Sequence, residues 1–133
     1  MKLKILLVED DDLEAMKLDR AFSKLDFKHT VVRAKNGEEA LVKSKECSLN
    51  LILLDLNMPR LNGLEFLSLL KSDEHQKFIP VVVFSTSNNH QDMIEAYKIG
   101  VAGYIVKPLH FSDYIEQIRK IIEYWAINEI VEK

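Results

Sequence analysis

Acidic, hydroxyl and basic side chains follow four apolar runs of this sequence, at the point where each run ends. They are Glu9 and Asp10 after residues 3–8, Asp55 after residues 49–54, Ser85 after residues 80–84 and Lys107 after residues 103–106. If these runs are parallel strands, their carboxyl ends meet at one edge of the sheet, where ligands of such sheets bind. The sequence therefore predicts one pocket that holds carboxylates, a hydroxyl and an ammonium group.

Carboxylates this close repel one another, and at least one should be driven to bind a proton. A hard divalent cation removes that repulsion, and ligation by oxygen alone suits Mg²⁺ or Mn²⁺. A zinc site has no support, because the four histidines lack ligand spacing and Cys47 is the single cysteine. We therefore expect Asp10, together with Glu9, to hold Mg²⁺ or Mn²⁺.

A carboxylate can also act as a nucleophile and form an acyl phosphate. Phosphoryl transfer requires a metal and fixed donors around the phosphoryl oxygens, so Asp55 is the candidate acceptor and Ser85 and Lys107 are the candidate donors. Each residue also has an ordinary explanation, since acids after a strand often cap helices and most lysines are solvated. Complementary chemistry at four strand ends favours the functional interpretation.

Apolar periodicity places these residues on alternating strands and helices. The expected strands are residues 3–8, 29–34, 49–54, 80–84 and 103–106, and the expected helices are residues 13–25, 37–47, 64–71, 91–99 and 111 to about 131. Nearly continuous Ile, Leu and Val in three of the strands is typical of a parallel sheet covered on both faces. Five strand–helix units predict an α/β sandwich with right-handed crossovers.

Length and composition limit the other functions. The 133 residues suit a single domain, and a net charge of −3 argues against a strongly basic nucleic-acid binder or a polybasic membrane anchor. No apolar stretch approaches the roughly 18 residues of a membrane span. One cysteine allows no intrachain disulfide, which favours a reducing, cytoplasmic location.

The ordered set of motifs resembles the receiver domain of bacterial two-component response regulators. The matching segments are residues 5–11 (ILLVEDD), 53–59 (LLDLNMP), Gly63, residues 80–85 (PVVVFS) and residues 103–108 (GYIVKP). The spacing also matches, with 45 residues from Asp10 to Asp55, 30 more to Ser85 and 22 more to Lys107. The resemblance covers residues 3 to about 124 of one receiver domain spanning residues 1–133.

The resemblance implies a flavodoxin-like three-layer fold with strand order 2-1-3-4-5. It implies that Asp55 is phosphorylated by a sensor histidine kinase in a Mg²⁺-dependent reaction, and that the protein is a signalling module that assists only its own phosphorylation and dephosphorylation. For the metal, the resemblance implies direct ligands in Asp10, Asp55 and the backbone carbonyl of Asn57, and a contact through water from Glu9. For the phosphoryl group, it implies a switch hydroxyl at Ser85 (alone or with Thr86) and an ion pair with Lys107. It also implies an aromatic switch residue at Tyr104 and a cis peptide bond between Lys107 and Pro108.

The end of the chain bears on the partners. A receiver domain takes about 120 residues, which leaves no room here for a DNA-binding domain, so we expect output through a downstream protein target or a phosphotransfer protein. Residues 85–87 and the pair Tyr124 and Trp125 are similar to regulators of bacterial phytochrome kinases. Extra apolar residues on the last helix cover the protein's own edge or form a partner or homodimer surface; they are Tyr114, Ile121, Tyr124, Ile127, Ile130 and Val131.

Two other functions fit the same fold class. A flavodoxin-like electron carrier would need a phosphate-binding loop after the first strand, where the acids at residues 9–12 would repel a phosphate. An aspartyl-phosphate phosphohydrolase typically has a second Asp two residues after the nucleophile, where this chain has Asn57. A yellow purified protein would favour the first function, and multiple-turnover release of phosphate would favour the second.

Overall fold

Residues 2–58 and 62–131, which the computed structural model describes, form a five-stranded parallel sheet and five helices. The strands are β1 (Lys4–Val8), β2 (Thr30–Ala34), β3 (Leu51–Leu54), β4 (Val81–Ser85) and β5 (Gly103–Val106); the helices are α1 (Asp12–Leu25), α2 (Gly37–Glu46), α3 (Gly63–Ser72), α4 (His90–Ile99) and α5 (Phe111–Ala126). The strand order is β2-β1-β3-β4-β5. The predicted flavodoxin-like α/β fold and its strand order are therefore confirmed.

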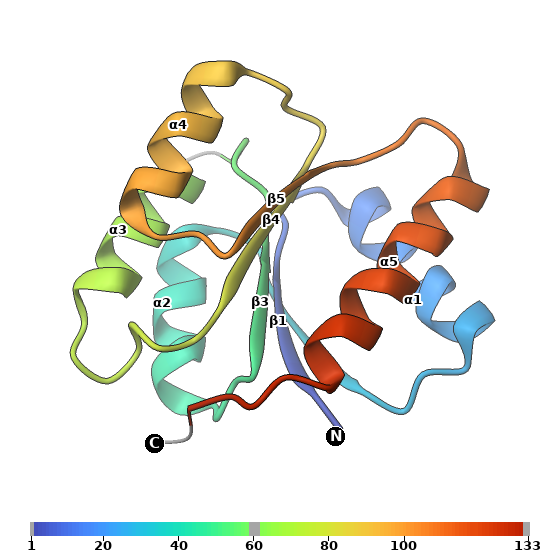
Figure 1. The fold of residues 1–133 in the computed structure, drawn as a ribbon, viewed down its shortest axis with the longest axis horizontal. Helices are drawn as coiled ribbons and strands as arrows, with labels where there is room; N and C mark the ends of the chain where they lie inside the picture. The colour runs from blue at the N-terminus through green and yellow to red at the C-terminus, as the bar shows by residue number, and fades with distance from the viewer. Residues whose placement is uncertain (1, 59–61, 132–133) are drawn as a thin grey trace.

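The sheet lies between two helical layers, with α1 and α5 on one face and α2, α3 and α4 on the other (Figure 1). Alternate residues of each central strand point to opposite faces. Leu6 and Ile52, for example, pack towards α2–α4, whereas Ile5 and Leu53 pack towards α1 and α5. Both faces of the central strands are buried, which explains their continuous apolar sequence.

Short polar side chains begin the helices on the carboxyl side of the sheet. Asp11 caps α1, with its carboxylate 2.8 Å from the backbone nitrogen of Leu13. Asn62 and Glu65 form a reciprocal capping box at the start of α3. These caps satisfy backbone donors that would otherwise lack partners, and they set where each loop after a strand ends.

Gly63, the first residue of α3, lies against the loop that follows β3. A Cβ atom at this position would lie 2.6 Å from the Leu56 Cα and 2.7 Å from the Asp55 carbonyl oxygen. Only a glycine allows this approach of two backbones. The helix thus supports the backbone at Asp55, while Pro59, which belongs to the same motif, lies outside the described residues.

The last helix ends earlier than expected. It was predicted to reach about residue 131, but α5 stops at Ala126 and Ile127 is its C-cap. The Asn128 side chain donates a hydrogen bond to the Tyr124 carbonyl oxygen at 2.6 Å. The Asn128 side chain thus binds a carbonyl oxygen that the next backbone N–H group of a longer helix would bind.

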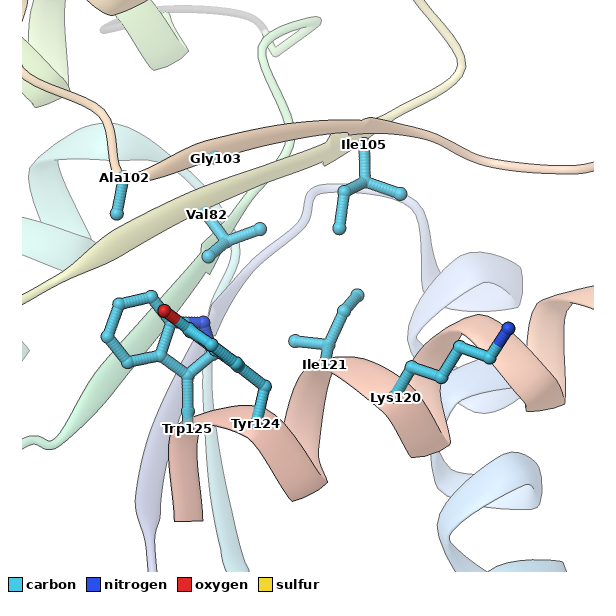
Figure 2. Close-up of a pocket in the computed structure, with 8 residues that line it drawn as sticks. All are labelled: Val82, Ala102, Gly103, Ile105, Lys120, Ile121, Tyr124 and Trp125. Carbon is cyan, nitrogen blue, oxygen red and sulfur yellow. The ribbon is translucent and has the colours of Figure 1, made fainter. Parts of the chain in front are cut away.

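The extra apolar residues of this region divide into two groups. Tyr114 and Ile121 are buried in the protein's own core, and Ile130 packs against the same core. Tyr124 and Ile127 remain 58% and 82% exposed. Beside them, Tyr124 and Trp125 line a mainly apolar groove of about 340 Å³ between α5 and the edge strand β5 (Figure 2).

Among the described residues, none of the helices is both long and apolar enough to cross a membrane.

Candidate functional site

The strands end nearly level with one another, so their following residues gather at one edge of the sheet. Val8 of β1 is paired with Leu54 of β3, and Ser85 of β4 is paired with Val106 of β5. The carboxylates that come next, Glu9, Asp10 and Asp55, have ligand atoms within 4.8 Å of one another. The structure therefore brings together the three carboxylates predicted from the sequence.

Glu9 is the buried member of this group. Its side chain is only 2% exposed, and one carboxylate oxygen lies 2.8 Å from the Lys107 Nζ. Burial raises the pKa of Glu9 to about 7, while the hydrogen bond and charge of Lys107 act in the opposite direction. Burial therefore opposes ionisation of Glu9 in this pocket, and Lys107 favours it.

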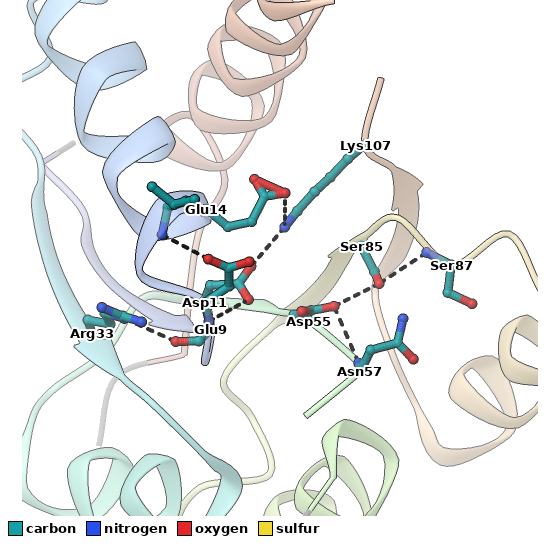
Figure 3. A network of polar contacts seen from close by, with 10 residues as sticks. Glu9, Asp11, Glu14, Arg33, Asp55, Asn57, Ser85, Ser87 and Lys107 are labelled. Carbon is teal, nitrogen blue, oxygen red and sulfur yellow. Dashed lines mark hydrogen bonds and ion pairs between the residues drawn. The ribbon is translucent and has the colours of Figure 1, made fainter. Parts of the chain in front are cut away.

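Lys107 crosses the pocket from the end of β5 to the loop after β1 (Figure 3). Its Nζ forms ion pairs with Glu9 at 2.8 Å and with Glu14 of α1 at 3.5 Å. Burial acts to lower the pKa of Lys107, but the hydrogen bond from Lys107 to Glu9 and the charges of Glu9, Glu14 and Asp55 together raise it above its ordinary value. Lys107 is therefore a permanently charged group at physiological pH.

Asp55 is half-buried and is held by neutral donors. Its Oδ1 accepts hydrogen bonds from the Ser85 Oγ at 2.8 Å and from the Asn57 backbone nitrogen at 3.3 Å. The Asp55 backbone nitrogen donates to the Val8 carbonyl oxygen at 3.0 Å, which ties the loop after β3 to β1. Asp55 thus presents a fixed carboxylate at the mouth of the pocket.

The structure separates the two adjacent hydroxyls of the loop after β4. Ser85 is fully buried and contacts Asp55, whereas Thr86 is exposed. Tyr104 belongs to β5 and contacts this loop from there, since its hydroxyl donates to the Ser87 carbonyl oxygen at 3.0 Å. Ser85 is therefore the hydroxyl beside the Asp55 carboxylate, and Tyr104 contacts the backbone two residues beyond Ser85.

The predicted cis bond between Lys107 and Pro108 is wrong, since the described residues contain no cis peptide bond. The trans form is the more stable one for most bonds before proline. The Lys107 backbone nitrogen donates to the Ser85 carbonyl oxygen at 2.8 Å, and the long side chain still reaches Glu9. The inward direction of the lysine does not require a cis bond.

Two residues of the site were not anticipated from the sequence. Arg33 of β2 donates through Nε to the Glu9 carbonyl oxygen at 3.0 Å and pairs through Nη1 with Asp12 at 2.8 Å. Glu14 of α1 pairs with Lys107. A helical period from the acids at residues 9–12 could have placed Glu14 near the pocket, but nothing in the sequence pairs it with a lysine 93 positions later.

The chemistry of the donor set decides which ion the pocket suits. Glu9, Asp10 and Asp55 offer only oxygen ligands and are not grouped with any histidine or cysteine among the described residues. Three carboxylates beside one ammonium leave an excess of negative charge, which a divalent cation balances. The cluster therefore fits Mg²⁺ or Mn²⁺.

Residues 5–119 match the response regulator receiver domain family, and the chain belongs to this family. The chain is 38% identical over 127 residues to the "Probable methanogenesis regulatory protein FilR2" of Methanothrix harundinacea, with 91% of this chain and 82% of that protein aligned. It is 31% identical over 128 residues to the response regulator Rcp1 of Synechocystis, with coverage of 91% and 87%.

Solved structures of response regulators share this fold. The phosphorylated cyanobacterial phytochrome response regulator RcpA superimposes with a TM-score of 0.90 at 34% identity and covers 98% of this chain and 99% of its own. The Mn²⁺-bound form of Rcp1 has a TM-score of 0.86 at 29% identity, with coverage of 97% and 99%. The chain is therefore a two-component signalling module, as its motifs indicate.

Proposed function

We propose that this protein is a phosphoaccepting response regulator in which Asp55 receives a phosphoryl group from a sensor histidine kinase. The observation that carries the proposal is the Asp55 carboxylate, held by Ser85 and the Asn57 backbone beside two further acids and a buried ammonium. In the transfer, a carboxylate oxygen of Asp55 forms a P–O bond while the P–N bond to the kinase histidine breaks. The ionised carboxylate needs no base, because it has no proton to lose.

A divalent cation completes the proposed site. Asp10 and Asp55 would bind Mg²⁺ or Mn²⁺ directly, the Asn57 backbone carbonyl would add a ligand, and Glu9 would act through water. When bound, the metal neutralises charge on the phosphoryl oxygens. The grouping of the three carboxylates supports this assignment, and relatives support it too, since Rcp1 has been solved with Mn²⁺.

Two side chains are positioned to hold the phosphoryl oxygens. The Ser85 hydroxyl already donates a hydrogen bond to Asp55, and the same hydroxyl can rotate to donate to a phosphoryl oxygen. The Lys107 ammonium lies in the same pocket and can supply a charged donor. Tyr104 would act as the aromatic switch, reporting changes in the loop of residues 85–87 to the surface near β5; its hydrogen bond to Ser87 supports this role.

The proposal extends to location and partners. A single receiver domain of residues 1–133, which is not an enzyme for other substrates, would take its phosphoryl group from a kinase of the phytochrome type. It would pass the signal to a downstream protein or a phosphotransfer protein, without nucleic acid or a membrane. The free Cys47 supports a reducing, cytoplasmic location.

The end of α5 would form the interaction surface that the phosphorylated state controls. Tyr124 and Ile127 are exposed there, and the groove beside β5 is mainly apolar. Exposed apolar area of this kind marks contact sites. A second copy of the chain or a target protein would bind it.

The test is labelling by a small phosphodonor such as acetyl phosphate in the presence of Mg²⁺. We expect the wild type to be labelled and Asp55→Asn to show no label, because the amide cannot form an acyl phosphate. EDTA should abolish labelling of the wild type. Asp12→Asn, which removes an exposed carboxylate, is the matched control and should label normally. Equal labelling of Asp55→Asn and the wild type would refute the proposal.

A further inference from the structure

The Lys107 ammonium forms its ion pairs on the β1–α1 side of the pocket. Its two ion-pair partners among the described residues, Glu9 and Glu14, belong to the loop after β1 and to the first turn of α1. The hydrogen bonds to the Asp55 carboxylate come instead from Ser85 and the Asn57 backbone. Figure 3 shows the lysine nitrogen between Glu14 and Glu9, with Asp55 beside Ser85 and Asn57.

Glu14 differs from Glu9 in its surroundings. Glu9 is buried, belongs to the acidic cluster and has a raised pKa, whereas the Glu14 side chain is 24% exposed and lies outside that cluster. The first turn of a helix favours a carboxylate, because the backbone N–H groups there carry partial positive charge. The first turn of α1 therefore holds the Glu14 carboxylate near Lys107, outside the acidic cluster.

We propose that Glu14 is a positioning residue that holds the Lys107 ammonium on the α1 side while Asp55 is unmodified and opposes its movement to a phosphoryl group. This inference rests on the proposed function. A phosphoryl group on Asp55 brings new anionic oxygens that compete for the same ammonium. For Lys107 to reach these oxygens, its ion pair with Glu14 must break. The free energy of breaking this pair lowers the affinity of the pocket for the phosphoryl group.

The test measures the affinity of the pocket for trifluoroberyllate, a phosphoryl mimic, at saturating Mg²⁺ by ¹⁹F NMR. Four proteins form a cycle: the wild type, Glu14→Gln, Lys107→Gln and the double variant. Glu14→Gln should tighten binding about three- to fivefold, the upper part of the range expected for loss of one partly exposed ion pair. In the Lys107→Gln background the same substitution should change the affinity less than about twofold, because the competing ion pair is already absent.

Asp12→Asn is the matched control. Asp12 also lies in the first turn of α1 and carries the same charge, but it pairs with Arg33. Asp12→Asn should therefore leave the affinity within about twofold of the wild type. Titration into the millimolar range keeps the weaker backgrounds measurable, and Lys107→Met replaces Lys107→Gln if the latter is unstable.

The outcomes separate the two proposals. Tightening that depends on Lys107 supports the positioning role. Equal tightening by Glu14→Gln in both backgrounds, or tightening by Asp12→Asn, would mean that Glu14 acts only through the overall negative charge near the pocket. Either result would refute the positioning role. Unchanged affinity in Glu14→Gln would refute it as well. A wild type that is labelled at Asp55 but insensitive to Glu14 leaves the proposed function intact, whereas a wild type that neither binds the mimic nor is labelled refutes both.

Discussion

The two sides of the pocket hold their carboxylates in different ways. On the β3–β4 side, Asp55 is half-buried and accepts hydrogen bonds from a hydroxyl and a backbone amide, which are neutral donors. On the β1–α1 side, Glu9 is almost fully buried and its partner is a buried ammonium. Neutral donors fix an oxygen without cancelling its charge, whereas the ion pair fixes both position and charge.

This difference divides the work of the pocket. The β3–β4 side leaves the Asp55 carboxylate accessible for bond formation. The β1–α1 side holds the Lys107 ammonium together with the Glu9 carboxyl group. Substitutions on the two sides should therefore fail in different ways. Those on the ion-paired side should alter charge and pH dependence, and those on the hydrogen-bonded side should alter the position of Asp55.

The largest effect among these substitutions is expected for Lys107→Gln on the ion-paired side. Loss of a charged donor to the phosphoryl oxygens should slow labelling by acetyl phosphate about a hundredfold, as measured by the initial rate at saturating Mg²⁺. Lys24→Gln removes the same charge from the exposed last turn of α1 and is the control. A rate for Lys107→Gln within about threefold of the wild type would mean that the ammonium serves folding alone.

The pH dependence of stability tests the buried acid. The pKa of Glu9 is raised by burial from its ordinary 4.5 to about 7, so between these values the folded protein binds more protons than the unfolded chain. The contribution of Glu9 to stability is therefore greatest at low pH and is lost as the pH rises through about 7.

In EDTA, the free energy of unfolding of the wild type relative to Glu9→Gln should fall by about 2 kcal/mol between pH 5 and pH 8. Urea denaturation at both pH values measures it. Saturating Mg²⁺ should reduce the fall, because a cation favours the ionised carboxylate. Curves for the two proteins that remain parallel would contradict the raised pKa.

The smallest of the three effects is expected on the hydrogen-bonded side. Ser85→Ala removes one neutral donor from Asp55 and should slow labelling about fivefold, the equivalent of one hydrogen bond of about 1 kcal/mol. Ser85→Thr keeps the hydroxyl and should label at nearly the wild-type rate. If Ser85→Ala slowed labelling as much as Lys107→Gln, the distinction between the two sides would not hold.

The core of the site could be predicted because it depends on strand ends. The apolar runs show where each strand ends. The topology of a parallel sheet then places Glu9, Asp10 and Asp55 together, whatever rotamers their side chains adopt. The ion pair between Glu14 and Lys107 could not be predicted in this way. It depends on how a flexible lysine crosses the pocket, which only packing decides.

The fold shows the same division between pattern and detail. Periodicity predicts all five helices and all five strands, but it does not predict that α5 ends at Ala126, where Ile127 and Asn128 form local hydrogen bonds with the last turn. The trans bond before Pro108 is a local choice of about 1 kcal/mol. A difference that small is decided by the surrounding contacts, and a motif does not report them.

The direction of the first strand and the last helix has a practical consequence. β1 begins and α5 ends at the edge of the sheet opposite Glu9 and Asp55 (Figure 1). An affinity tag, a fluorophore or a surface tether joined ahead of β1 or after α5 would therefore begin at the far side of the protein. Immobilised in this way, the molecule would present its acidic pocket outward to a kinase in solution.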